Sequence, residues 1–294
     1  MPKVSILGAG VVGTCVGKGL LRLGHDVKFY DISTARDDQL RKEGLAATTS
    51  PENALDSSEV SFICVPTPTL SGSIELTYLQ SVTKELANFL KDQVTYHLVV
   101  VKSTVVPTTT EKIIIPMLEQ HSKRTVGEQL GICVNPEFMT EIHESWTSDH
   151  SFARGFTDEP AIVIGELDEK AGDKLAQLYE RLSLPIVRTN LVTAEMIKYA
   201  FNCALATRIS YWNEIYYACK LLGIDSELVA QVVSMDARIG TYGTIHGKAF
   251  GGKCLPKDLR AFLKFLSDLG YDAKLLNAVE EINERIGTER GVRE

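Results

Sequence analysis

The chain has 294 residues, of which 44% are hydrophobic and 23% are charged, so it can bury a sizeable core, and its length favours two domains. Its 31 Lys and Arg against 38 Asp and Glu give a net charge of −7, which argues against a surface for nucleic acid or anionic membranes. No apolar run is long enough to span a bilayer, no signal peptide is recognisable, and the six cysteines form no CxxC pair, so we expect a cytoplasmic protein.

Strand and helix signals alternate through the first half of the chain. A helical pattern at residues 14–23 ends at Gly24. Short apolar or β-branched runs predict strands at residues 4–7, 27–30, 60–65, 97–101, 132–134 and 161–164. This alternation is typical of βαβ units, so residues 1–190 are expected to form a Rossmann-like domain around a doubly wound parallel sheet.

The pattern changes near residues 185–191. Helices are predicted at residues 193–222 and 226–234, followed by a glycine-rich loop at 239–253 and further helical sequence as far as Arg285. Residues 191–294 are therefore expected to form an all-helical domain, so the fold class is α/β followed by helices.

A glycine-rich turn follows the first predicted strand. Its sequence is GAGVVG at residues 8–13, the GxGxxG pattern whose glycines allow a tight turn, the approach of a pyrophosphate and close helix packing. The following helix N-terminus favours an anion. Asp31 ends the second predicted strand, where a carboxylate accepts a ribose 2′-hydroxyl and favours NAD over NADP, although Arg36 weakens this preference. The alternative is a glycine turn that binds no nucleotide.

The most informative stretch is FGGKCLPKD at residues 250–258. Cys254 follows paired glycines and precedes a proline and a helical run, which predicts a position at a helix N-terminus. The helix dipole, Lys253 and Lys257 would favour its thiolate form, and Asp258 would lie one turn further along the same face. The alternative of a small buried cysteine is favoured for the five that lie in apolar stretches: Cys15, Cys64, Cys133, Cys203 and Cys219.

Polar residues on the long predicted helix form a second candidate group. Glu195, Lys198 and Asn202 are spaced i, i+3, i+7, so they share one stripe of the helix. The lysine could donate to an oxyanion and the asparagine could position substrate or water. The alternative is a solvated helix face.

Acidic residues follow the predicted strand at 132–134. Glu137 and Glu141 come just after this strand, at the sheet edge where α/β proteins bind ligands. Together with His143 and Glu144 they could suggest a metal site, but their spacing matches no known ligand pattern, so no metal is expected.

With these motifs, the chain resembles the UDP-glucose/GDP-mannose dehydrogenase family, NAD-dependent enzymes that oxidise a sugar-nucleotide alcohol to the uronic acid. The resemblance covers Met1 to about Glu284 and implies a homodimer that pairs through the helical domain. Six motifs support it in order: GAGVVG at 8–13, ICVPTP at 63–68, KSTV at 102–105, NPEF at 135–138 with Glu141, the Lys198/Asn202 helix running into ISYWNEI, and FGGKCLPKD at 250–258.

The resemblance implies a reaction with two oxidations. Cys254 would attack the aldehyde formed by the first hydride transfer, and a second NAD would oxidise the thiohemiacetal to a thioester that water hydrolyses. Lys198 would stabilise the oxyanions, with Asn202 beside it. Protons and the hydrolytic water would be handled by Asp258, Glu137 and Thr104.

The resemblance also implies binding residues. The NAD site would be lined by Gly8, Ala9, Gly10, Val11, Val12, Gly13, Asp31, Arg36, Val65, Pro66, Thr67, Pro68, Thr69, Ser103, Thr104, Val105, Glu141 and Lys257. The sugar nucleotide would contact Glu137, Glu141, Lys198, Asn202, Phe250, Gly251 and the rest of the loop at 245–251. Arg238 resembles an arginine that reaches the neighbouring subunit's site.

The chain departs from the family pattern in three places. The segment between Asp31 and the strand at 60–65 is short and lacks a Glu-Pro-Gly, and Met139-Thr140-Glu141-Ile142 replaces the usual glycine after the second glutamate. The family's third domain, which binds the nucleotide half of the substrate, is missing. We therefore expect either a truncated form or a two-domain relative with a different or smaller substrate.

Two other functions stay open. A two-electron β-hydroxyacid dehydrogenase related to 6-phosphogluconate dehydrogenase has a similar length and a Lys-x-x-x-Asn pair like Lys198 and Asn202. It needs no cysteine, so the motif at 250–258 favours the sugar-nucleotide interpretation. A non-catalytic NAD-binding relative would explain the missing binding surface, although every expected catalytic residue type is present.

Overall fold

The computed structural model describes residues 2–70, 72–140, 153–252 and 254–289, and divides into two compact units. Unit 1 contains the chain up to Pro68, Glu75–Met139 and Arg154–Lys198. Among the described residues, unit 2 contains most of the chain from Tyr199 onward, together with Thr69–Ile74, Thr140 and Ala153. The division of the sequence into domains at 190/191 stays a prediction, since the chain passes from one unit to the other inside a helix, between Lys198 and Tyr199.

Unit 1 is built around an eight-stranded sheet in the order β10-β9-β8-β7-β4-β1-β2-β3. The strand order reverses at β1, which pairs in parallel with both β2 and β4, so the predicted doubly wound sheet is confirmed. The central strands are buried on both faces, which explains why they appear as continuous apolar runs. The strands are β1 (Lys3–Leu7), β2 (Asp26–Tyr30), β3 (Ala47–Thr48), β4 (Val60–Ile63), β7 (His97–Val101), β8 (Leu130–Val134), β9 (Ile162–Glu166) and β10 (Ile186–Asn190).

One pairing differs from the predicted all-parallel arrangement. β9 runs antiparallel to β8, with Cys133 opposite Glu166, and β10 is parallel to β9. Because β8 and β9 are antiparallel neighbours, β9 begins at the edge of the sheet where β8 ends. The sequence does not predict β10, because its side chains are mostly exposed.

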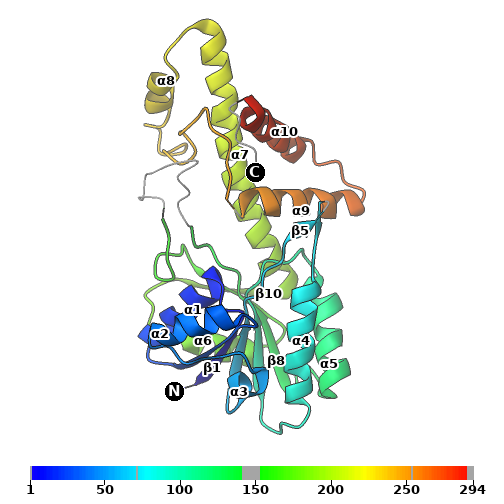
Figure 1. Ribbon diagram of the computed structural model, residues 1–294. Coiled ribbons are helices and arrows are strands. Elements are labelled where there is room, and N and C mark those ends of the chain that lie inside the picture. Colours follow the sequence, from blue (N-terminus) through cyan, green and yellow to red (C-terminus); the bar gives the residue numbers. More distant parts are fainter. Residues whose placement is uncertain (1, 71, 141–152, 253, 290–294) are drawn as a thin grey trace. The chain divides into compact units, whose positions relative to one another are not determined.

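Helices cover both faces of this sheet. Figure 1 shows α1 and α6 on one face and α4 and α5 on the other. α1 begins at Val11, earlier than the predicted residue 14, because the helix starts directly after the turn glycine Gly10. The helices are α1 (Val11–Arg22), α2 (Thr34–Lys42), α3 (Pro51–Leu55), α4 (Thr77–Leu90), the π-helical turn η1 (Thr110–Ile114), α5 (Ile115–Ser122) and α6 (Glu169–Tyr179).

Unit 2 is mainly helical. The elements are most of α7 (Leu191–Leu222), then α8 (Ser226–Val233), α9 (Leu255–Asp268) and α10 (Lys274–Glu289), with the hairpin β5 (Thr69–Leu70) and β6 (Ser73–Ile74). The uninterrupted α7 confirms the predicted long helix. The single helical stretch expected near the end of the chain is two helices, because the chain turns at Gly270, where φ is 80°.

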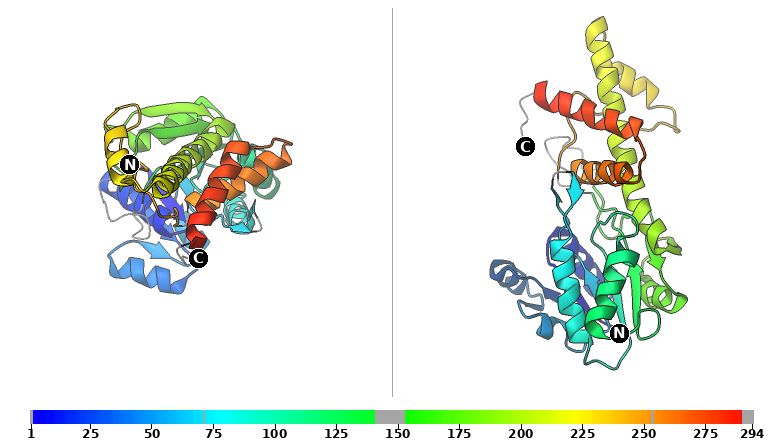
Figure 2. Two further views of the ribbon diagram at one scale, coloured as in Figure 1. Left: turned by 90° about the horizontal axis from the view of Figure 1, so that it is seen from above. Right: turned by 90° about the vertical axis from the view of Figure 1, so that its right-hand side faces the viewer.

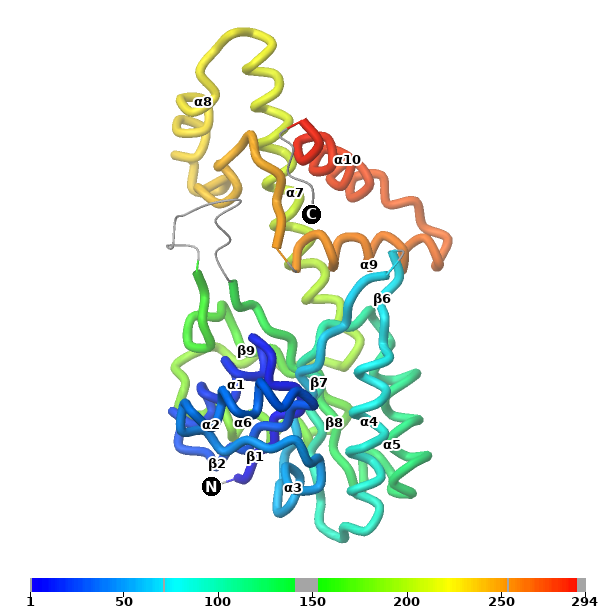
Figure 3. The backbone as a smooth tube through the Cα atoms, viewed as in Figure 1, coloured from blue at the N-terminus to red at the C-terminus, as the bar shows by residue number. Residues whose placement is uncertain are grey.

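Aromatic and polar contacts hold the helices of unit 2 together. The ring of Tyr199 on α7 stacks on Phe262 of α9 with centroids 5.3 Å apart, and Ser210 Oγ donates to the carbonyl of Val279 on α10. Both views of Figure 2 show α9 and α10 beside α7. The β5–β6 hairpin lies against α9 (Figure 3), where Thr69 Oγ1 donates to the carbonyl of Lys257 at 3.1 Å.

None of the helices in the described part of the chain combines the length and the apolar character needed to cross a membrane.

Candidate functional site

The glycine turn before α1 is tight on one side and open on the other. Gly8 has a φ of 95°, and a Cβ at Gly13 would lie 2.0 Å from the carbonyl oxygen of Gly8. A Cβ at Gly10 would meet no atom within 4 Å, and no side chain caps the N-terminus of α1. A phosphate group can therefore approach the backbone at Gly10, so the turn fits the pyrophosphate of a dinucleotide.

Asp31 and Arg36 both bind the backbone of Ala9 in this turn, Asp31 at its N–H and Arg36 at its carbonyl. Asp31 Oδ2 accepts from the backbone N–H of Ala9 at 2.9 Å, and its Oδ1 accepts from the N–H of Ser33 at 3.0 Å. Arg36 Nε donates to the carbonyl of Ala9 at 2.6 Å, and its Nη2 donates to Thr14 Oγ1 at 2.6 Å. Both predicted cofactor residues thus lie at the turn. Of the two valines that follow it, Val11 is exposed and Val12 is half-buried.

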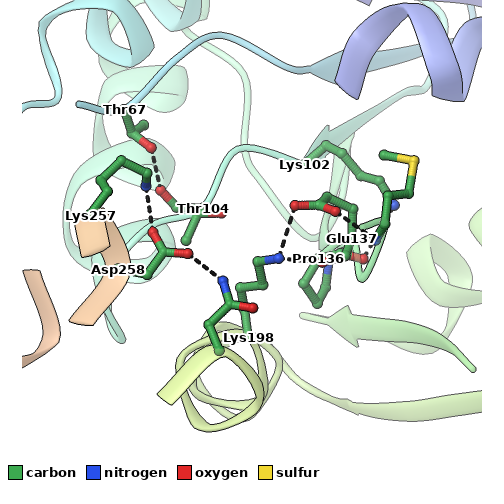
Figure 4. Close-up of polar contacts among 10 residues, drawn as sticks. Thr67, Lys102, Thr104, Pro136, Glu137, Lys198, Lys257 and Asp258 are labelled. Atoms are coloured by element: carbon green, nitrogen blue, oxygen red, sulfur yellow. Dashed lines mark hydrogen bonds and ion pairs between the residues drawn. The ribbon is translucent and has the colours of Figure 1, made fainter. Parts of the chain in front are cut away.

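The two other predicted cofactor segments lie against each other in unit 1. Thr67 Oγ1 donates to the carbonyl of Thr104 at 2.7 Å (Figure 4), and Ser103 Oγ donates to the carbonyl of Val65 at 2.6 Å. The rest of the two segments consists of Pro66, which is exposed, Pro68, which is half-buried, and Val105, which is buried. Thr69, which follows the first segment, belongs to unit 2.

Lys198 and Glu137 form an almost fully buried ion pair. Lys198 Nζ lies 2.9 Å from Glu137 Oε1 and donates to the carbonyl of Glu137 at 2.7 Å (Figure 4). Glu137 Oε2 accepts from the backbone N–H of Met139 at 2.8 Å, which orients the carboxylate. The structure thus joins two predicted site residues that are 61 positions apart in the sequence.

Two further buried charged residues, Lys102 and Glu159, lie near this pair. The sequence predicts a role for neither of them. Lys102 Nζ donates to Asn135 Oδ1 at 3.0 Å and to the carbonyl of Pro136 at 3.2 Å. Burial raises the pKa of Glu159, an effect that the positive charges of Lys102 and Lys198 oppose. Lys102 is part of the KSTV motif, whereas the only sequence signal for Glu159 is an acidic residue shortly before an apolar strand.

Glu195 contacts a different segment from its neighbours on α7. Its carboxylate accepts from the backbone N–H groups of Thr108 at 2.6 Å and Thr110 at 2.9 Å. Burial raises the pKa of Glu195, and hydrogen bonds from Thr110 and Thr108 oppose the shift. Because Glu195, Lys198 and Asn202 are all buried, the alternative of a solvated helix face is wrong.

Cys254 lies immediately before α9 in unit 2, which confirms its predicted position at a helix N-terminus. It is exposed, whereas Cys15 is half-buried and the others are buried. Burial raises the pKa of the Cys64 and Cys203 thiols to about 12. Cys254 is thus the most accessible of the six thiols.

One turn along α9, Asp258 is held by two polar partners. Asn202 Nδ2 donates to Asp258 Oδ2 at 2.5 Å, and Lys257 Nζ lies 2.5 Å from Asp258 Oδ1 (Figure 4). Asp258 is only 1% exposed. The buried carboxylate therefore keeps a cation and an amide as fixed partners.

The remaining predicted substrate residues lie elsewhere in unit 2. Phe250 is buried, and its N–H donates to Asn283 Oδ1 at 2.7 Å, while Gly251 is exposed. Asn213 accepts from the N–H of Gly247 and donates to the carbonyl of Lys248, which fixes the loop at 245–251. The exposed Arg238 pairs with Asp236 at 2.6 Å. Outside the described residues lie Glu141, His143, Glu144 and Lys253.

Within the described ranges, no three His, Cys, Asp or Glu side chains are grouped so that they could hold a metal ion. The absence of a metal from the working protein stays a prediction.

Two family models match the sequence. The NAD binding domain of the UDP-glucose/GDP-mannose dehydrogenase family matches residues 37–183, and the central domain of that family matches residues 192–285. The chain belongs to the UDP-glucose/GDP-mannose dehydrogenase family. It is therefore an NAD-dependent dehydrogenase that acts on a CH–OH group.

Individual relatives agree with this assignment. The chain is 38% identical to the GDP-mannose 6-dehydrogenase of Pseudomonas syringae pv. tomato, over 96% of this chain and 68% of that protein. It is 35% identical to the UDP-glucose 6-dehydrogenase AglM of Haloferax volcanii, over 96% and 69%. The solved structure of a UDP-glucose dehydrogenase from Pyrobaculum islandicum superposes with a TM-score of 0.87 at 32% identity, over 97% of this chain and 68% of that one. The chain therefore spans about two thirds of the length of these relatives.

Proposed function

We propose that this dehydrogenase oxidises the primary alcohol of a nucleotide sugar to the uronic acid in two steps, through a covalent intermediate on Cys254. The observation that carries the proposal is the exposed thiol at the start of α9, one turn before the buried Asp258. The relatives named above act on GDP-mannose and UDP-glucose, which supports a nucleotide sugar as substrate.

The proposed reaction removes four electrons. Two molecules of NAD, bound in turn at the glycine-rich turn of residues 8–13, would supply the hydride acceptors for the two oxidations. In the first, the alcohol carbon loses a hydride and its hydroxyl loses a proton, which leaves an aldehyde. The Cys254 thiolate then forms a C–S bond to the aldehyde carbon, whose oxygen becomes an oxyanion, and loss of a second hydride from this thiohemiacetal anion gives a thioester. Water attacks the thioester, the C–S bond breaks, and the carboxylate and the thiol are released.

The buried polar groups have distinct roles in this scheme. The Lys198 ammonium, oriented by Glu137, would donate to the oxyanions that form at the reacting carbon. Asn202 and Lys257 hold the Asp258 carboxylate ready to take a proton from the hydrolytic water. Glu137 and Thr104 would assist with proton transfer.

Binding residues are proposed on the same basis. The glycine turn at residues 8–13 would hold the pyrophosphate of NAD, and Asp31 would accept the ribose hydroxyls while Arg36 lies beside them. The segments at 65–69 and 103–105, with Glu141 and Lys257, would complete the cofactor site. For the sugar nucleotide we propose Glu137, Glu141, Lys198, Asn202, Phe250, Gly251 and Arg238.

The stoichiometry of NADH formation tests the proposal. Wild-type protein with GDP-mannose or UDP-glucose should form two NADH per sugar oxidised, whereas Cys254→Ser should form no uronic acid. One NADH per substrate in the wild type would favour the two-electron alternative, and full turnover by Cys254→Ser would exclude the thioester route. Calorimetry that detects NAD binding but no sugar-nucleotide binding would favour the non-catalytic alternative. UDP-N-acetylsugars should be tested as substrates in the same assays.

We also propose that two copies pair through the helical unit. Large apolar side chains are exposed at the end of α7 and just after α8: Leu221 is 88% exposed, Leu222 is 72% exposed and Met235 is 74% exposed. Large exposed apolar side chains support a protein interface on this unit. A second copy of the chain is the proposed partner, and Arg238 would reach its site.

A further inference from the structure

We propose that Glu195 is a positioning residue, which fixes the loop carrying Thr104 to the turn of α7 that carries Lys198. This inference rests on the proposed function, in which Thr104 and Lys198 take part in the reaction. All the residues that carry the argument belong to unit 1.

Glu195 accepts hydrogen bonds from two backbone groups. The residue is 2% exposed, its Oε2 accepts from the N–H of Thr108 at 2.6 Å, and its Oε1 accepts from the N–H of Thr110 at 2.9 Å. Hydrogen bonds to a charged acceptor are about twice as strong as neutral ones. Both oxygens of one side chain thus hold two nearby points of the same loop.

Thr108 has a backbone conformation that needs its hydrogen bond to Glu195. Its φ is 78°, in the left-handed region that a β-branched residue rarely adopts. Such a conformation persists only when surrounding contacts enforce it, and such residues cluster at functional sites. The bond from the Thr108 N–H to Glu195 is one of those contacts.

The helical turn that follows the loop also depends on Glu195. η1 begins at Thr110, and Thr109 at its N-cap position makes no side-chain capping bond. The Glu195 carboxylate satisfies the Thr110 N–H instead and places a negative charge at the helix N-terminus, where it is favourable. The cap therefore comes from α7 and not from the local sequence.

The loop is anchored at its other end by different groups. Ser103 Oγ donates to the carbonyl of Val65, and the carbonyl of Thr104 accepts from Thr67 Oγ1. Glu195 is thus the anchor on the α7 side, three residues before Lys198 on the same helix face. Without it, Thr108 could relax to negative φ and Thr104 would shift relative to Lys198.

The test compares Glu195→Ala and Glu195→Gln with a matched control, Asp168→Ala. Asp168 caps α6 in the same unit by accepting from the N–H of Ala171 at 2.9 Å, and we give it no role in the reaction. Hydrogen exchange of the segment 103–115 and steady-state kinetics with NAD and the sugar nucleotide are measured for each protein. The exchange measurement needs no turnover.

We expect Glu195→Ala to lose protection in the segment 103–115 and to lower kcat roughly 10- to 100-fold, because small displacements of reacting groups have effects of this size. KM for the sugar nucleotide should change much less than kcat. The protection and kcat of Glu195→Gln should lie between those of the wild type and Glu195→Ala, since its amide oxygen can still accept one N–H bond. If Glu195→Ala does not fold, Glu195→Gln is compared with the wild type in its place. Asp168→Ala should lose protection only near α6 and keep its kcat.

A double variant separates positioning from a general loss of stability. If Glu195 acts through Thr104, adding Thr104→Val to Glu195→Ala should lower kcat little further. Lost protection with an unchanged kcat, or an equal loss of kcat in Asp168→Ala, would overturn the inference. If the wild type forms one NADH per sugar, the two-step oxidation is wrong but the inference about Glu195 is not. Loss of hydrogen-exchange protection and a slower hydride transfer in Glu195→Ala would still support the positioning role.

Discussion

Cys254 differs from the other five cysteines in its exposure as well as in its sequence neighbours. The thiols of Cys64 and Cys203 have a pKa of about 12 because they are buried, so at pH 8 roughly one in 10⁴ of each is ionised. An exposed thiol at a helix N-terminus has neither the steric protection nor the desolvation of its buried counterparts. Reactivity toward alkylating agents should therefore separate Cys254 from the rest.

We predict that iodoacetamide at pH 8 modifies Cys254 first in the native protein. Peptide mass spectrometry should find one fast site, and all six cysteines should react after unfolding in urea. Cys254→Ser removes the fast site and serves as the control. Fast modification of a second cysteine in the native protein, or an unchanged rate in the variant, would contradict the prediction.

The Lys198–Glu137 pair allows a stability prediction. Lys198→Met leaves the Glu137 carboxylate buried without its cation, so the free energy of unfolding should fall by about 3–5 kcal/mol. Adding Glu137→Gln removes the unpaired charge and should restore part of the loss. Urea unfolding followed by fluorescence measures both.

A solvent-exposed pair in the same unit is the control for this prediction. Lys174 and Glu59 lie 3.2 Å apart with side chains that are 24% and 49% exposed. Lys174→Met should therefore cost less than about 1 kcal/mol. Equal losses for the two lysine variants would show that burial does not set the strength of the Lys198 pair.

The candidate residues could be predicted from the sequence, but their partners could not. Helical spacing places Glu195, Lys198 and Asn202 on one stripe, and this holds in α7. Glu195 binds N–H groups 87 and 85 positions away, and these contacts depend on how the chain folds back. Glu159 was missed for the same reason, since burial next to two lysines leaves no local pattern.

At the scale of elements, β7 begins with a histidine that the sheet keeps neutral. His97 is buried, its Nδ1–H donates to the carbonyl of Ser58, and its Nε2 accepts from the hydroxyl of Ser61, which also contacts Ser5. One neutral tautomer satisfies both ring nitrogens. Burial lowers the pKa of His97 from 6.5 to about 4.

This shift predicts a loss of stability in acid. The unfolded chain binds a proton at His97 near pH 6.5 and the folded chain only near pH 4, so the contribution is complete above pH 6.5 and is lost as the pH falls toward 4. Neutral His97 thus contributes on the order of 3 kcal/mol to the free energy of unfolding. Urea unfolding at pH 7.5 and 5.0 should show a smaller fall for His97→Asn than for the wild type. Equal falls would exclude His97 as the cause.

The elements differ in how well the sequence predicts them. α7 has no glycine or proline and a clear end, so its bounds are predicted within two residues. The direction of β9 depends on the path of the chain between two strands, which no local pattern encodes. The β5–β6 hairpin has strands of two residues each, too short for any periodicity.

At the scale of the whole molecule, the proposed dimer makes a prediction about mass in solution. Light scattering after size-exclusion chromatography should give twice the mass of the chain for the wild type. Leu221→Asp combined with Met235→Asp should shift the protein to monomer, because two charges would be buried in the interface. Leu269, 67% exposed at the end of α9, supplies the control variant Leu269→Asp, which should stay dimeric. A monomeric wild type would contradict the proposal.

The β5–β6 hairpin has a consequence for how this protein can be divided. The chain leaves unit 1 after Pro68, contributes six residues to unit 2 and returns at Glu75, and one hairpin hydroxyl binds the first turn of α9. A single cut near residue 190 would therefore remove from the helical part a piece of its own structure. The two parts are interlaced along the chain, so a recombination event at one site could not exchange either of them as an intact module.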